Sequence, residues 1–156
     1  MAIRSNPSSH PLLSHVDGAA AGALDFVLLV GRVLLGWLFL ASGWGKLTNI
    51  GGFVNYLTSL KVPNPGLWAW PGAIVEFVMG AALVLGVGTR YAALIGIVFV
   101  ALATALAHRY WEYPAAAQGN QYNHFLKNLS IIGGMFAIFA AGAGRFSVDA
   151  ILAKKH

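Results

Sequence analysis

Two charged residues lie inside stretches of sequence that are long and apolar enough to cross a membrane. Arg32 falls in the first such stretch and Glu76 in the second. A charge inside a bilayer is costly, so an intramembrane Arg or Glu indicates a functional site with a partner nearby. At ~1.5 Å per residue from the expected helix ends, the backbones of the two residues differ in membrane depth by roughly 4 to 11 Å. A long Arg side chain can bridge this difference. We therefore predict that Arg32 and Glu76 form a structural ion pair.

A second group of polar residues lies where the apolar stretches end. Lys46 ends the first stretch, His108 ends the third, and Lys127 with Asn128 opens the fourth. All four are expected at the same membrane boundary, with Glu76 just beneath them, so they describe a polar funnel that opens outward. The candidate site therefore consists of catalytic Glu76 and His108 and of cofactor-binding Trp44, Lys46, Lys127 and Asn128.

The composition explains why these residues must lie on membrane helices. Hydrophobic residues make up 58% of the 156-residue chain, charged residues only 10%, and the mean hydropathy is +0.68, whereas soluble domains carry about 25% charged residues. Each crossing needs ~20 apolar residues. Four stretches meet this need: Leu24–Lys46, Trp68–Gly88, Arg90–His108 and Phe125–Gly142. They do not alternate as barrel strands do, so the sequence predicts an all-α, four-transmembrane-helix bundle.

The connecting segments complete the predicted architecture. The hairpin Gly86–Arg90 is so short that it makes the second and third helices antiparallel neighbours. Between the first and second helices, Ile50–Leu60 carries apolar residues at helical spacing, which predicts a short interfacial helix on the outer surface. Outside a membrane domain of residues 23–149, we expect a flexible N-terminal tail (1–22) and a short basic C-terminal tail (150–156).

The positions of the basic residues indicate the orientation. With both termini in the cytoplasm, the inner side carries Arg4, Arg90, Arg145, Lys154 and Lys155, and the outer side carries Lys46, Lys61, Arg109 and Lys127. This is a weak positive-inside bias. The net charge of +5 then reflects anchoring to the lipid bilayer through anionic headgroups. Binding of nucleic acid is not indicated, because the chain has no basic stripe with a binding motif.

The chain has no cysteine, so it cannot form or exchange a disulfide. Metal binding is a weak hypothesis: His108, His124, Glu76 and Glu112 supply ligand types, but no close histidine pair is present. Any redox role must therefore use a bound quinone, another external cofactor or a partner subunit.

As an ordered set, these residues resemble a known family. The string GRVLLGWLFLASGWGKL contains the Arg and an SGxxKL motif, and IVEFVMGAALVLGVGTRYAAL contains the Glu before a G-x-x-T-R hairpin. A His closes the third helix, and FLKNLSIIGG contains the Lys-Asn pair. From Arg32 to Asp149, the chain resembles the DoxX family of small four-helix bacterial membrane proteins. The resemblance implies an inner-membrane protein similar to the membrane subunits of thiosulfate:quinone oxidoreductase.

The leading functional hypothesis is a quinone-linked redox subunit. In it, His108 and Lys127 donate hydrogen bonds to the quinone, Glu76 relays protons and Trp44 flanks the ring, while electrons pass to or from a partner redox subunit. Three alternatives stay open: a polar network that only ties the helices together, a non-catalytic assembly or structural subunit of a membrane complex, and a small-molecule transporter. The small residues on the helix faces also permit a homodimer.

Overall fold

The computed structural model describes residues 11–154, and all the regular structure in this range is helical. The long helices are α1 (Pro11–Thr48), α3 (Pro65–Leu85), α4 (Thr89–Ala107) and α5 (Ala115–Ala141). Shorter ones are α2 (Ile50–Ser59), the 3-10 helix η1 (Tyr110–Glu112) and α6 (Val148–Ala153). Four segments are long and apolar enough to span a membrane: Val16–Thr48, Pro65–Leu85, Thr89–Glu112 and Ala115–Ala141. The predicted all-α fold with four spans and a short helix after the first is confirmed.

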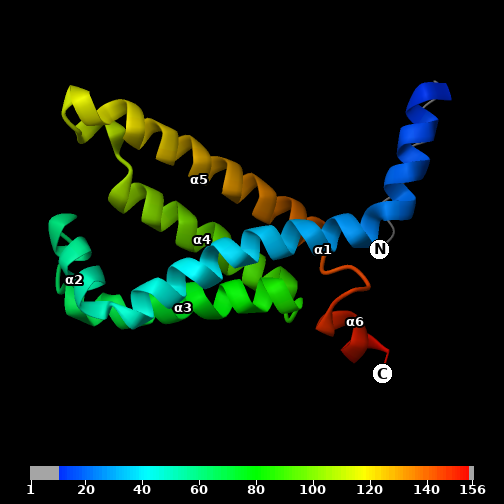
Figure 1. Cartoon of the computed structure of the whole chain (residues 1–156), viewed down its shortest axis with the longest axis horizontal. Coiled ribbons are helices and arrows are strands. Elements are labelled where there is room, and N and C mark those ends of the chain that lie inside the picture. The colour runs from blue at the N-terminus through cyan, green and yellow to red at the C-terminus, as the bar shows by residue number, and fades with distance from the viewer. Residues whose placement is uncertain (1–10, 155–156) are drawn as a thin grey trace.

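Two helices begin ten or more residues earlier than the sequence predicted. Residues 11–22, expected within a flexible tail, form the first turns of α1, and the remaining tail residues lie outside the described range. Residues 16–22 of these turns are exposed and include three consecutive alanines, whose high helix propensity favours the helix without an apolar stripe. Figure 1 shows that they bend away from the other helices. Likewise, α5 begins ten residues before Phe125, because its polar first turns continue beyond the apolar stretch.

The bundle consists of two helix pairs that form a wedge. Helix α1 packs along α3, and α4 packs along α5. Figure 1 shows the two pairs converging near α6 and separating toward α2. We call these the α6 end and the α2 end of the bundle. The α3–α4 hairpin, which closes at Gly86 in the left-handed conformation, lies at the α6 end.

Glycines allow α1 and α3 to pack closely. A Cβ atom on Gly43 would lie within 3 Å of the Phe77 backbone, and one on Gly80 within 3 Å of the Leu40 backbone. In lipid, burial of apolar surface contributes little to helix association, so the van der Waals contacts made by closely approaching backbones stabilise the helix pair. The α1–α3 pair therefore provides a rigid wall on one side of the wedge.

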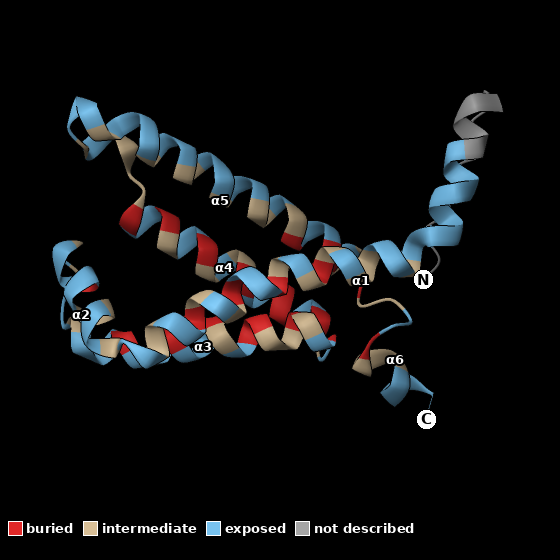
Figure 2. Cartoon of the chain, viewed as in Figure 1, coloured by how far each residue is buried: buried red, intermediate tan, exposed pale blue. Residues whose placement is uncertain are grey.

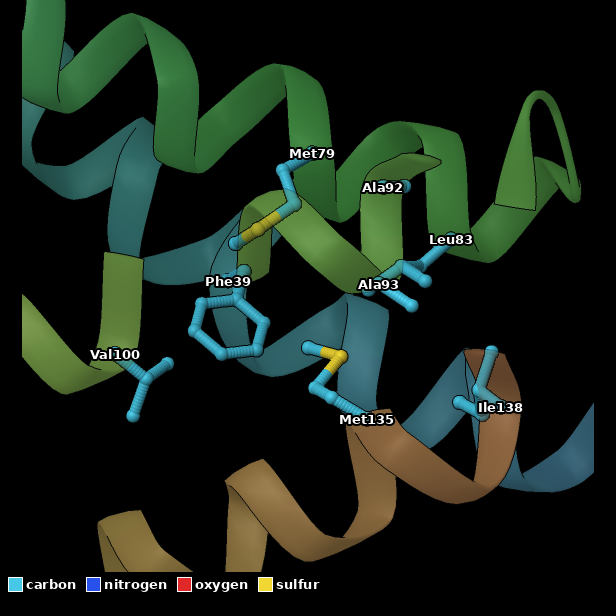
Figure 3. Close-up of a cluster of buried hydrophobic side chains, with 8 residues drawn as sticks. All are labelled: Phe39, Met79, Leu83, Ala92, Ala93, Val100, Met135 and Ile138. Atoms are coloured by element: carbon cyan, nitrogen blue, oxygen red, sulfur yellow. The ribbon is translucent and has the colours of Figure 1, made fainter. Parts of the chain in front are cut away.

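A compact apolar cluster joins the two pairs where they converge. All four long helices contribute to it, and Figure 3 shows the Phe39 ring among the cluster's side chains, with Met79 above it and Met135 below and beside it. Figure 2 shows that buried positions are concentrated in this region and along the facing sides of the helices. The cluster consists of Phe39, Met79, Leu83, Ala92, Ala93, Val100, Met135 and Ile138. It fixes the wedge at one end and leaves the α2 end free to hold a cavity.

Candidate functional site

Glu76 is buried on α3 and pairs with Lys46 of α1. The glutamate is 4% exposed. Its Oε2 atom accepts a hydrogen bond from Lys46 Nζ, which also donates to Ser42 Oγ at 3.1 Å. The Phe53 ring lies 5.2 Å from the same ammonium. The carboxylate is therefore neutralised within the helix pair on which it lies.

The predicted ion pair between Arg32 and Glu76 is therefore wrong. Arg32 lies fourteen residues before Lys46 on α1, roughly 21 Å along the helix, and its guanidinium points to the α6 end. It donates to the backbone oxygens of Leu83 (2.9 Å), Val84 (2.7 Å), Ala143 (3.1 Å) and Phe146. Two of these carbonyls end α3, where no intrahelical donor reaches them. Arg32 is only 1% exposed. Its guanidinium is satisfied by these backbone carbonyls and not by a carboxylate, so Arg32 acts as a structural clamp between α1, the end of α3 and the segment after α5.

Asp149 strengthens the same end of the bundle. Its carboxylate accepts hydrogen bonds from the backbone N–H groups of Gly88 (2.7 Å) and Thr89 (2.9 Å), which open α4. Burial raises the pKa of Asp149, but these two hydrogen bonds and the charge of Arg32 together hold the pKa below its ordinary value. These contacts hold α6 against the α3–α4 hairpin, so the polar residues at this end of the bundle stabilise the fold.

The opposite end contains a cavity of about 550 Å³ between the two helix pairs. Most of its lining is apolar, and α1 to α5 all contribute side chains. Its polar lining residues come from both sides of the wedge: Ser42, Lys46 and Glu76 on α1 and α3, and His108, His124, Lys127 and Asn128 after α4 and on α5. Five residues predicted from the sequence are thus gathered in one cavity.

The polar wall formed by α4 and α5 is a hydrogen-bonded set. The His108 and His124 rings stack with their centroids 4.9 Å apart, and His108 Nδ1 lies 2.8 Å from Gln121 Oε1. Lys127 Nζ lies 3.1 Å from His124 Nδ1. In the described part of the chain, Lys127 has no carboxylate within salt-bridge distance. This wall therefore presents a positive charge to the cavity that the neighbouring side chains leave uncompensated.

The aromatic residue predicted beside the site is the wrong one. Trp44 is 57% exposed and does not line the cavity; its ring centroid is 6.0 Å from that of Phe77. It precedes Lys46 by two residues, which at about 100° per residue places it on nearly the opposite face of α1. Trp68 of α3 lines the cavity instead, together with Tyr56 of α2. Burial raises the pKa of Tyr56, with a further contribution from Tyr113, so its hydroxyl remains a donor.

Several contributors were not predicted. The sequence indicated His124 only as a candidate metal ligand, and it did not indicate Ser42, Thr104 or Gln121 as site residues. Ser42 precedes Lys46 by four residues and therefore shares its helix face, which the sequence does reveal. Among the described residues, no group of three or more metal-ligating side chains could hold an ion.

A comparison with known proteins supports the family resemblance. The model of the DoxX family matches residues 27–109. This range covers 83 of the 156 residues and includes Arg32, Lys46, Glu76 and His108, whereas Lys127 and Asn128 lie beyond it. No solved structure shows a significant match to the chain.

Curated relatives agree with this match. The chain is 35% identical to inner membrane protein YqjF of Escherichia coli over 84% of its own length and 95% of that protein. It is 32% identical to inner membrane protein YphA of the same species, over 88% and 96% of the two chains. A more distant similarity, 22% identity, extends over 40% of the ER-derived vesicles protein ERV29 of Saccharomyces cerevisiae. Together with four membrane-spanning helices, these matches show that the chain is an integral membrane protein of the DoxX family.

Proposed function

We propose that this protein is a quinone-linked redox subunit of the bacterial inner membrane and that the cavity at the α2 end binds the quinone headgroup. Two relatives are named inner membrane proteins, which supports this location. Both termini are proposed to lie in the cytoplasm, so that the α2 end faces the outer side. The cavity then lies in the outer half of the bilayer, within reach of a lipid-soluble ligand.

The observation that carries the proposal is the placement of hydrogen-bond donors on two opposite walls of a mostly apolar cavity. Lys46 donates from the α1–α3 side, and Lys127 from the α4–α5 side. A quinone has two carbonyl oxygens on opposite edges of a flat apolar ring, so these donors fit its chemistry. The cavity volume of about 550 Å³ falls within the range of roughly 300 to 1,000 Å³ that is typical of small-molecule sites.

The residues have distinct roles in this proposal. Glu76 and Ser42 fix the Lys46 ammonium, so its remaining N–H can orient one end of the headgroup. Lys127 orients the other end of the headgroup, and its positive charge stabilises the negative charge that the quinone ring gains when it is reduced. Glu76 and His108 are proposed to relay protons to and from the ligand. A quinone takes up two electrons and two protons, which supplies redox chemistry that the side chains of this cysteine-free chain lack. A partner redox subunit supplies or receives the electrons.

Ligand retention tests the proposal. The protein is extracted from its membrane into lipid nanodiscs, incubated with decylubiquinone and separated from empty nanodiscs before the bound quinone is quantified by chromatography. We expect wild-type protein to retain the quinone above the empty-nanodisc level. Lys46→Met and Lys127→Met should each reduce retention about tenfold, the effect of losing one charge-assisted hydrogen bond. Lys61→Met is the matched control, because Lys61 is exposed near the same end and does not line the cavity.

The same preparation separates the proposal from its alternatives. Retention that equals the empty-nanodisc level in a folded wild-type protein contradicts quinone binding. A stoichiometric partner protein that copurifies without quinone supports an assembly or structural role. Equal retention by the wild type and both cavity variants places any bound quinone elsewhere on the protein.

A further inference from the structure

The orientation of the Asn128 amide is fixed by a neighbouring hydroxyl. Thr104 Oγ1 lies 2.7 Å from the backbone oxygen of Val100 and 2.8 Å from Asn128 Nδ2. A hydroxyl has one hydrogen, and a carbonyl oxygen can only accept, so the Thr104 hydrogen is committed to Val100. Thr104 Oγ1 can therefore only accept from Asn128. The amide nitrogen of Asn128 must face Thr104, which is 6% exposed and holds this contact in place.

This arrangement leaves the amide oxygen of Asn128 available to a ligand. Asn128 lines the cavity, and its Oδ1 atom takes no hydrogen bond from any residue in the described range. The cavity thus presents a fixed hydrogen-bond acceptor on its α4–α5 wall. Such an acceptor favours a ligand that carries an O–H or N–H group. A ligand without a donor would remove water from the acceptor without replacing the hydrogen bond, and it would therefore bind less tightly.

Hydrogen-bond donors line the same wall as this acceptor. Lys127 directly precedes Asn128 on α5, and its ammonium can only donate. The contact of 3.1 Å with His124 Nδ1 therefore requires that nitrogen to accept, which places the ring hydrogen of neutral His124 on Nε2. Lys127 and His124 both line the cavity. One wall thus combines an acceptor with donors, which is the complement of a hydroxyl group.

We infer that the cavity selects the reduced, hydroxyl-bearing form of its ligand, a quinol, over the oxidised quinone. The inference rests on the proposed quinone site and adds its preference for one redox form. A quinone carbonyl accepts from Lys127 and leaves Asn128 Oδ1 unmet. A quinol hydroxyl accepts from the same ammonium and donates to Asn128 Oδ1. Thr104 acts as a positioning residue, since it touches Asn128 and sets which amide atom meets the ligand.

Paired binding measurements test this inference. Protein in nanodiscs is titrated without oxygen with decylubiquinone and, separately, with decylubiquinol, and the bound fraction is corrected for empty nanodiscs. We expect the quinol to bind about tenfold more tightly, the effect of one additional hydrogen bond in a partly desolvated site. Thr104→Val removes the hydroxyl and frees the amide to turn, so the preference should fall to within about twofold. Thr104→Ser keeps the hydroxyl and should keep the preference.

A second variant covers the case in which Thr104→Val does not fold. Asn128→Leu removes the acceptor itself and should lower quinol affinity while changing quinone affinity less. Equal wild-type affinity for the two forms, tighter binding of the quinone, or an equal loss of both ligands in Thr104→Val would each overturn the inference. If the folded wild type binds neither form, the proposed function fails, and the inference fails with it.

Discussion

Replacement of Glu76 by Gln tests the ion pair that closes one wall of the cavity. The Glu76 side chain is 5% exposed and that of Lys46 is 27% exposed, so the variant leaves an ammonium in a mostly apolar setting. Breaking a buried pair by removing one partner costs about 3 to 5 kcal/mol in soluble proteins. Ser42 still accepts from Lys46, and the lysine keeps some solvent contact. We therefore expect a loss near the lower limit, about 3 kcal/mol in the free energy of unfolding.

A double-mutant cycle measures the pairing directly. Glu76→Gln, Lys46→Met and the double variant are unfolded by SDS in mixed micelles, with circular dichroism as the signal. We expect the double variant to lose at least about 1 kcal/mol less than the sum of the single losses, because the two groups contact one another. Arg32→Gln combined with Glu76→Gln is the control cycle and should be additive, since Arg32 bonds the carbonyls of Leu83 and Val84, about two turns along α3 from Glu76, and does not contact the carboxylate. Coupling to Arg32 with none to Lys46 would refute the structural assignment.

Three further predictions concern the α6 end and the helix packing. Arg32→Lys should lower the free energy of SDS unfolding by about 2 to 4 kcal/mol, because an ammonium cannot reach the separate carbonyls that the guanidinium fork spans; an unchanged value would show that the clamp contributes nothing. Gly80→Ala should destabilise by about 1 to 3 kcal/mol through collision with the α1 backbone, while Gly133→Ala, with open space around it, should not destabilise. The lowered pKa of Asp149 stabilises the folded protein at pH values above the pKa of the unfolded carboxyl, and this stabilisation should be lost as the pH falls through the native pKa. Asp149→Asn should therefore unfold more easily at pH 7, and its stability should depend less on pH in the acid range. A pH profile of stability equal to that of the wild type would contradict this.

The fold was predictable because its main determinant is linear in the sequence. Stretches of apolar residues long enough to cross a bilayer identify the spans without knowledge of their packing. The segment at Ile50 was equally clear from its helical apolar spacing. The sequence did not predict the start of α1, because exposed turns such as residues 16–22, with three consecutive alanines, need no apolar periodicity. The close approach at Gly80 was not proposed, since the partner surface on α1 is known only once the helices are packed.

The site was predictable in its residue types but not in its pairings. Polar residues at the ends of apolar stretches marked Lys46, His108 and Lys127 correctly as neighbours, because helix ends meet at one membrane boundary. Arg32 was assigned a carboxylate partner, whereas its acceptors are backbone carbonyls, which every residue carries and which no side-chain pattern reveals. The contact of Asn128 with Thr104 depends on the rotation of α4 against α5, and the sequence alone does not set that rotation.

Photoaffinity labelling tests most directly the claim that the cavity binds a quinone. Protein in native-membrane nanodiscs is irradiated with a photoreactive azidoquinone, digested and sequenced by mass spectrometry, with and without excess decylubiquinone. We predict that labelling occurs on the cavity-lining segments near Lys46, Glu76 and Lys127, and that the excess quinone suppresses it. Labelling confined to lipid-facing positions, or unaffected by the excess quinone, would contradict the account.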